Sequence, residues 1–279
     1  MNRVLIFFLL ITGLTLAQPD SLLHNGWNTK GTTGLNLSQI ALSNWSQGGD
    51  NSMAFDLTGK FSFIYFSSPF RLDNNLSLSY GRTKIGGEDF RTSDNDFYLE
   101  NVLSYKIDWE FKPYFSNSVR TVLANGYQYN SDTTYQISSF FDPGYVTQSL
   151  GLLYDKSKIF QTRLGLALQE TFASKFTQYS DDPDTPNKIE KFKLETGIES
   201  VSSLNYTLAQ NLLIDSDLRL FTRFKHLDTW DVRWDNTLTA QVNKFVNVNL
   251  NVLVVYQKDQ SPKTQVKEAL QLGVTYNIF

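Results

Sequence analysis

The chain contains 279 residues, of which 41% are hydrophobic and 14% aromatic, and its formal net charge at pH 7 is -3. This mildly acidic balance excludes the dense basic patch of a nucleic-acid-binding protein, so no nucleic-acid partner is expected. The chain has no cysteine, which excludes disulfide bonds and a lipidated cysteine behind an export signal.

The first residues have the pattern of a cleaved signal peptide. Arg3 supplies a positive charge, residues 4–16 are almost wholly apolar, and Ala17 is the small residue that a signal peptidase needs. The apolar run is shorter than the roughly 20 residues of a membrane-spanning helix. We therefore predict a signal peptide over residues 1–17 and a short periplasmic leader over residues 18–33.

From residue 34 onward, segments of alternating apolar and polar residues predict β-strands with one apolar face. Met53, Phe55 and Leu57, for example, alternate with Asp56 and Thr58, and side chains of a strand point to opposite faces in turn. The expected strands cover residues 34–43, 52–66, 69–82, 96–110, 113–129, 144–154, 158–173, 190–207, 211–225, 230–243, 245–257 and 266–278. About twelve such strands behind a signal peptide predict an all-β fold, an antiparallel transmembrane β-barrel over residues 34–279, in the bacterial outer membrane.

The connections between these strands alternate in length. Short turns are expected at residues 67–68, 111–112, 155–157, 209–210 and 244, and longer loops at residues 44–51, 83–95, 130–143, 174–189, 226–229 and 258–265. Short periplasmic turns and long external loops are typical of outer-membrane barrels. Aromatic residues should form a belt at each end of the outer face, with Tyr80, Tyr127 and Tyr145 in one belt and Tyr65 and Phe70 in the other.

The opposite face of the strands is charged and should line the lumen. The lumen-lining candidates are Arg71, Asp73, Arg120, Arg163, Asp215, Asp217, Arg219, Arg223 and Arg233. Unpaired ions in a confined space are costly, so charges of both signs should pair, which predicts a narrow or partly occluded bore. The arginines are candidates for selecting ions or anionic solutes. Four asparagines, at positions 74, 101, 117 and 236, fall on the apolar face, where a local bulge would redirect them.

Three segments resemble a known family. Residues 35–55 read LNLSQIALSNWSQGGDNSMAF, residues 80–96 read YGRTKIGGEDFRTSDND, and residues 231–259 read DVRWDNTLTAQVNKFVNVNLNVLVVYQKD. Together they resemble an uncharacterised domain-of-unknown-function family of outer-membrane barrels from Bacteroidetes-type bacteria. The resemblance implies the fold and the location, but the family has no assigned reaction or substrate.

The most distinctive loop motif contains Trp45, Gln47, Gly48, Gly49 and Asp50. A tryptophan beside backbone exposed by two glycines could stack on a sugar or clamp a peptide. The structural interpretation is a turn in which the glycines permit positive φ and the tryptophan packs on the barrel rim. We favour the structural interpretation.

No catalytic residue, metal site or cofactor is predicted. A lipase-type or protease-type mechanism requires a histidine as general base, and the chain has only His24, in the leader, and His226, in an expected loop. The acidic clusters at residues 94–96 and 181–184 lack the spacing of a known Ca²⁺ loop, so a solvated surface is the preferred interpretation.

The expected function is a small passive channel or a solute-binding conduit. The alternative is a non-enzymatic structural or interaction barrel, closed by salt bridges in its lumen, whose loops contact a partner or a surface polymer. An outer-membrane hydrolase is a third alternative, which the shortage of histidine argues against. The expected partners are outer-membrane lipid, small solutes and the barrel-insertion machinery.

Overall fold

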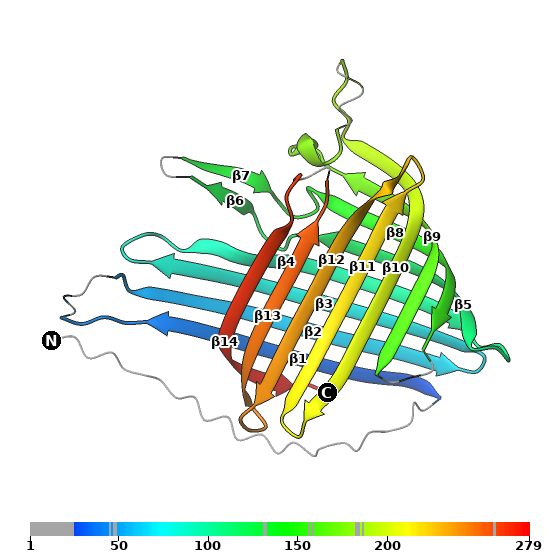
Figure 1. Ribbon diagram of the computed structural model, residues 1–279, viewed down its shortest axis with the longest axis horizontal. Coiled ribbons are helices and arrows are strands. Elements are labelled where there is room, and N and C mark those ends of the chain that lie inside the picture. The colour runs from blue at the N-terminus through cyan, green and yellow to red at the C-terminus, as the bar shows by residue number, and fades with distance from the viewer. Residues whose placement is uncertain are drawn as a thin grey trace.

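The computed structural model describes residues 25–44, 46, 49–130, 133–155, 157, 159–181, 185, 187–258 and 261–279. Within these residues, twelve antiparallel strands form a closed barrel (Figure 1). The barrel strands are β1 (Gly26–Ile40), β2 (Ser52–Ser67), β3 (Phe70–Ile85), β4 (Arg91–Tyr105), β5 (Phe111–Thr121), β8 (Gly144–Tyr154), β9 (Phe160–Phe172), β10 (Phe192–Ala209), β11 (Leu212–Arg223), β12 (His226–Gln241), β13 (Val246–Tyr256) and β14 (Gln265–Asn277). The predicted twelve-stranded antiparallel barrel is therefore confirmed.

The barrel order follows the chain, except that a separate hairpin interrupts it. Strands β6 (Gly126–Tyr129) and β7 (Thr134–Ser138) pair only with each other, in the connection between β5 and β8, and they project from the rim in Figure 1. We expected residues 113–129 to form a single strand, but β5 ends at Thr121. A short 3₁₀ helix, η1 (Thr177–Tyr179), lies between β9 and β10. No helix within the described ranges is long and apolar enough to span a membrane.

Alternation along each strand separates an inner face from an outer face. In β9, Leu164 is 58% exposed and Leu166 is 63% exposed, whereas the alternating residues Arg163 and Gln169 are 8% and 4% exposed. In a closed barrel the buried set faces the lumen and the exposed set faces outward. The wall is thus apolar outside and polar inside, as its sequence period dictates.

The two ends of the barrel differ in their connections. Residues 68–69, 106–110, 155–159, 210–211 and 242–245 join strands at one end, and the longer segments 41–51, 122–143, 173–191 and 257–264 join them at the other. Two loops expected at the second end are shorter than predicted: residues 86–90 join β3 to β4, and residues 224–225 join β11 to β12. In both places the strands stay paired beyond a register shift, after Gly81 in β3 and after Thr222 in β11. Pairing therefore extends into residues that were expected to form the loops.

Aromatic contacts occur near both ends of the wall. Phe70 contacts Tyr105 at one end, with ring centroids 5.0 Å apart, and Phe172 contacts Phe192 at the other, at 5.2 Å. Two residues were wrongly assigned to the outer belt. Tyr145 alternates with the outward residues of β8 and lines a cavity inside the barrel, and Tyr127 belongs to the β6–β7 hairpin.

The barrel closes between its first and last strands. Strand β1 pairs with β14 from Thr32↔Asn277 to Leu37↔Leu272, and the Gly31 amide donates to the Phe279 carbonyl at 3.1 Å. Strand β1 also pairs with β2 from Gly26 onward. Residues 26–33, which we expected in the leader, are therefore part of the barrel. The predicted signal peptide lies outside the described residues.

Candidate functional site

The inside of the barrel contains a cavity of about 420 Å³ toward the end with the long loops. Strands from opposite parts of the wall contribute to its lining, and the residues used below are Asp96 and Tyr98 from β4, Arg120 from β5, Arg219 from β11, Arg233 from β12 and Lys267 from β14. Tyr179 of η1 also lines it. Burial raises the pKa of the Tyr179 hydroxyl above its ordinary value.

One carboxylate in this cavity is shared by two arginines. Arg120 Nη1 donates to both oxygens of Asp96, at 2.8 and 2.9 Å, and Arg233 Nη2 lies 3.5 Å from Asp96 Oδ1. The Arg120 guanidinium also stacks over the Tyr98 ring, 4.2 Å from its centroid. Two guanidinium groups thus depend on a single carboxylate.

The contact between Arg233 and Asp96 crosses the lumen. Strands β12 and β4 are opposite each other in the barrel, with five strands between them in either direction. Lys267 on β14 similarly reaches Asp94 on β4, at 2.8 Å. Ion pairs between opposite walls occupy the bore at this level, as the predicted pairing of lumenal charges requires.

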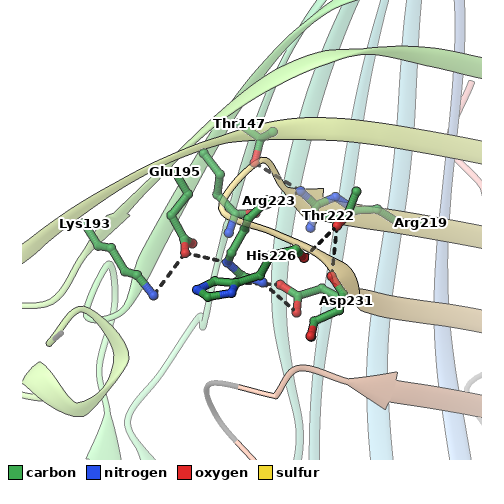
Figure 2. A network of polar contacts seen from close by, with 10 residues as sticks. Thr147, Lys193, Glu195, Arg219, Thr222, Arg223, His226 and Asp231 are labelled. Atoms are coloured by element: carbon green, nitrogen blue, oxygen red, sulfur yellow. Dashed lines mark hydrogen bonds and ion pairs between the residues drawn. The ribbon is translucent and has the colours of Figure 1, made fainter. Parts of the chain in front are cut away.

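A second network connects β10, β11 and β12 along the wall (Figure 2). Arg223 lies between Glu195 and Asp231 and donates to the Asp231 carboxylate at 3.1 and 2.9 Å. Lys193 pairs with Glu195 at 3.0 Å. Arg223 therefore has two carboxylate partners and is fully engaged.

Arg219 binds the neighbouring strands in a comparable way. It donates to Glu199 at 2.7 Å, to Gln169 at 3.0 Å and to Thr147 at 3.4 Å. The Phe221 ring lies below the guanidinium, 5.6 Å from it, and is completely buried. Arg219 thus spans β11, β10, β9 and β8 on the inner surface.

The interior is packed more tightly farther from the long loops. Arg163 on β9 binds Glu100 on β4, and these residues are 8% and 9% exposed. The Tyr98 hydroxyl donates to Glu100 Oε1 at 2.7 Å, and Tyr114, only 2% exposed, shares a hydrogen bond of 2.8 Å with Ser149. Because Tyr98 also lines the cavity, this buried layer is adjacent to it.

The structure distributes the nine predicted lumen residues over several parts of the inner face. Arg120, Arg219 and Arg233 line the cavity, Arg223 pairs with Asp231 near the long loops, and Arg163 pairs with Glu100 farther from them. Toward the short-turn end, Arg71 pairs with Asp73 at 2.9 Å. Asp217 accepts from Ser203 at 2.5 Å, and Asp215 accepts from Asn205. The structure does not bring these residues together in a single site.

Sequence reasoning missed three charged residues of the cavity region, Asp94, Asp96 and Lys267. Asp94 and Asp96 were assigned to a solvated acidic cluster because the strand was expected to begin only at residue 96, whereas β4 begins at Arg91. Lys267 lies inside the expected strand 266–278, and its alternation with outward residues was a usable signal. The contact between Lys267 and Asp94 depends on the barrel closing and could not be read from either strand.

The distinctive loop motif is only partly described. Trp45, Gln47 and Gly48 lie outside the described residues. Gly49 has φ of 109°, a conformation that glycine accepts and other residues rarely adopt. A Cβ added to Gly86, in the neighbouring loop, would lie 3.5 Å from Asp50. The described part of the motif, Gly49 and Asp50, therefore lies next to the β3–β4 loop.

The histidine candidates and the acidic cluster at residues 181–184 gain no site partners among the described residues. The acidic cluster at residues 94–96 was expected on a solvated surface, but Asp94 and Asp96 face the lumen and pair with Lys267, Arg120 and Arg233. His24 and residues 182–184 lie outside the described residues. His226 is the first residue of β12, and the hydrogen bond from Thr222, at 3.2 Å, goes to its backbone carbonyl (Figure 2). Among the described residues, no group of three or more histidine or acidic side chains could hold a metal ion.

Residues 37–127 match the model of a family described as a protein of unknown function, DUF3078. The match includes most of residues 35–55 and all of residues 80–96, on which the resemblance rests in part, but it does not reach residues 231–259. No curated protein matches the chain.

Several solved structures are similar to the chain at low identity. An outer membrane channel from Pseudomonas putida F1 is 11% identical, with 94% of this chain and 98% of that chain covered, and a TM-score of 0.40. The translocator domain of the autotransporter NalP from Neisseria meningitidis is 11% identical, with 92% and 90% covered and a TM-score of 0.38. The KdgM porin in complex with disordered oligogalacturonate is 12% identical, with 89% and 99% covered and a TM-score of 0.32. The fold assignment rests on the strand pairing of this chain itself.

Proposed function

We propose that the protein is an outer-membrane barrel that acts as a passive conduit for small solutes with an anionic group. The proposed location is supported by the outward apolar face and by the aromatic residues near both ends of the wall, since lipid requires both features. Its closed barrel leaves no unpaired strand edge, which a membrane-spanning sheet also requires.

The observation that supports the anionic solute is the pair of guanidinium groups sharing Asp96 in the cavity. Arg120 binds this carboxylate at 2.8 Å and Arg233 approaches it from the opposite wall at 3.5 Å. A carboxylate or phosphate on an entering solute can replace Asp96 as the partner of Arg233, because guanidinium groups bind both anions in the same planar geometry. Such an exchange opens the bridge across the lumen without leaving either arginine unpaired.

The second candidate function is an interaction barrel with a closed lumen. The Arg163–Glu100 pair, less than a tenth exposed, supports it, as does the hairpin outside the barrel, where Tyr135 is 55% exposed. In that case the ion pairs are permanent and the external loops contact a partner.

Recording ion currents from the protein in planar lipid bilayers separates these candidates. A conduit gives discrete conductance steps and, in a KCl gradient, a reversal potential on the anion-selective side. Removing one charge with Arg233→Gln should lower anion occupancy about fivefold, because a charge at 4 Å in water contributes about 1 kcal/mol. The selectivity should move toward cations accordingly.

Arg91→Gln is the matched control, since Arg91 pairs with Glu88 on the exposed rim and not in the lumen. It should leave the reversal potential unchanged. Inorganic phosphate should reduce the wild-type current and have less effect on Arg233→Gln. Silent bilayers from a folded barrel, verified by heat-dependent gel mobility, would reject the conduit and favour the interaction barrel.

A further inference from the structure

A row of side-chain amides crosses the outer face of the wall. Asn74 on β3 is opposite Asn101 on β4, Asn101 is opposite Asn117 on β5, and Asn117 is opposite Gln148 on β8. The pairing is regular at all four positions. The bulge that we expected to redirect the asparagines is therefore absent from this row, and the amides point outward.

The row lies between apolar rows of the outer face. On one side it is flanked by outward residues that include Leu103, Phe115 and Leu150, which are 42%, 47% and 62% exposed. On the other side it is flanked by Leu99 and Val119, which are paired with each other. The aromatic residues near the ends of the wall lie beyond both rows, so headgroups do not reach the amides.

The amides only partly satisfy one another. Asn101 Nδ2 donates to Asn74 Oδ1 at 2.7 Å, and Asn74 Nδ2 donates to the Phe63 carbonyl at 3.0 Å. Gln148 Nε2 lies 3.5 Å from Asn117 Oδ1. Each amide has two N–H donors and a carbonyl acceptor, so these bonds leave hydrogen-bonding capacity unused, above all between Asn101 and Asn117 at the centre of the row.

Polar groups on other strands of the outer face, from β9 to β12, are arranged differently. Thr162 and Ser202 share a hydrogen bond of 2.8 Å, and Ser216 donates to Asn236 at 2.7 Å while accepting from Trp234 at 2.9 Å. A hydroxyl has only one O–H to satisfy, and these pairs use it. Surplus amide capacity is therefore concentrated on β3, β4, β5 and β8.

We infer that the amide row is the contact surface for a second copy of this chain within the membrane. Lipid offers no hydrogen bonds, so polar side chains in a membrane favour association with another polar surface. Amides both donate and accept, and a row of them is complementary to itself. A two-fold axis perpendicular to the membrane, passing in front of Asn101 and Asn117, would bring the centres of two such rows face to face in an isologous interface.

The inference depends on the outer face lying in lipid but not on whether the lumen conducts. It can therefore fail while the conduit holds, and the reverse is also true. The occupant is a second copy because amides both donate and accept hydrogen bonds, so the row is chemically complementary to itself. A different protein or a lipid as the occupant would leave the isolated barrel monomeric.

The chain has no cysteine, so a single introduced thiol is unique. The variant Asn101→Cys, reconstituted in lipid vesicles at high lipid-to-protein ratio, is treated with a short bifunctional thiol reagent. The matched control is Leu238→Cys on β12, an outward position on the opposite side of the barrel. The cross-linked dimer should form at least several-fold faster for Asn101→Cys than for Leu238→Cys. Equal rates, or no dimer from Asn101→Cys, would overturn the inference.

A second measurement does not depend on cross-linking. In the variant Asn101→Leu/Asn117→Leu, the centre of the row becomes apolar, which suits a lipid-facing surface, so the barrel should fold with unchanged heat-dependent mobility. Its particle mass in lipid nanodiscs should shift from dimer to monomer. A wild-type protein that is monomeric in nanodiscs, or a double variant that is still dimeric, would refute the proposed interface.

Discussion

The buried Arg163–Glu100 pair leads to the sharpest prediction of stability. The variant Glu100→Gln removes the charge while preserving the shape of the side chain. The side chains of Arg163 and Glu100 are only 9% and 11% exposed, so Arg163 would keep a buried charge without its carboxylate. The nearest alternative, Glu199, is already bound by Arg219 at 2.7 Å.

Breaking a buried pair by removing one partner costs about 3–5 kcal/mol in proteins. The adjacent cavity admits water, and the Tyr98 hydroxyl, 2.7 Å from Glu100 Oε1, can still donate to the glutamine. We therefore expect the lower end of that range, about 3 kcal/mol, which corresponds to about a hundredfold change in the unfolding equilibrium. The double variant Glu100→Gln/Arg163→Met removes both charges and should lie within about 1 kcal/mol of wild type.

The assay is urea unfolding of the barrel in lipid vesicles, followed by the fluorescence of its tryptophans, of which the chain has five. Glu100→Gln should lower the midpoint at constant slope, and the double variant should restore it. If Glu100→Gln is as stable as wild type, Arg163 is solvated. If Glu100→Gln/Arg163→Met is as unstable as Glu100→Gln, packing and not charge determines the loss of stability.

Two further predictions concern the wall. Leu166→Arg, at an outward position that is 63% exposed, should destabilise the barrel in lipid by about 2–4 kcal/mol, and a stability equal to wild type in the same urea assay would contradict the outward assignment. Gly197→Ala places a Cβ 1.9 Å from the Thr222 carbonyl oxygen and should cost about 1–3 kcal/mol through backbone displacement, seen as a lower midpoint. Gly87→Ala, where the added Cβ meets nothing within 4 Å, is its control and should be neutral; equal effects from both glycine variants would refute the steric argument.

Local sequence determined the two faces of each strand. Leu164 and Arg163 face opposite sides because successive side chains in a strand alternate, and this rule needs no knowledge of the neighbouring strands. Where the rule was applied inconsistently the prediction failed: Tyr145 has the parity of Thr147, not that of Leu150 and Tyr154, and it faces the cavity.

Strand ends were predicted less well. The β11–β12 connection was expected at residues 226–229, but pairing resumes at His226, and the Thr222 hydroxyl binds the carbonyls of His226 and Thr229 at 3.2 and 3.0 Å. These contacts join the end of β11 to the start of β12 and follow from the register of the two strands. Composition near the loop does not encode that register.

The sequence by itself determined the barrel class, the approximate strand count and the polarity of each face, because these follow from a period of two along one strand. Only the tertiary structure decided which inner charges meet. Arg233 and Asp96 are on opposite strands of the barrel, and Asn101 meets Asn74 through register. The Arg233–Asp96 contact depends on closure of the barrel, and the Asn101–Asn74 contact depends on the alignment of two neighbouring strands. No single segment of the chain specifies either one.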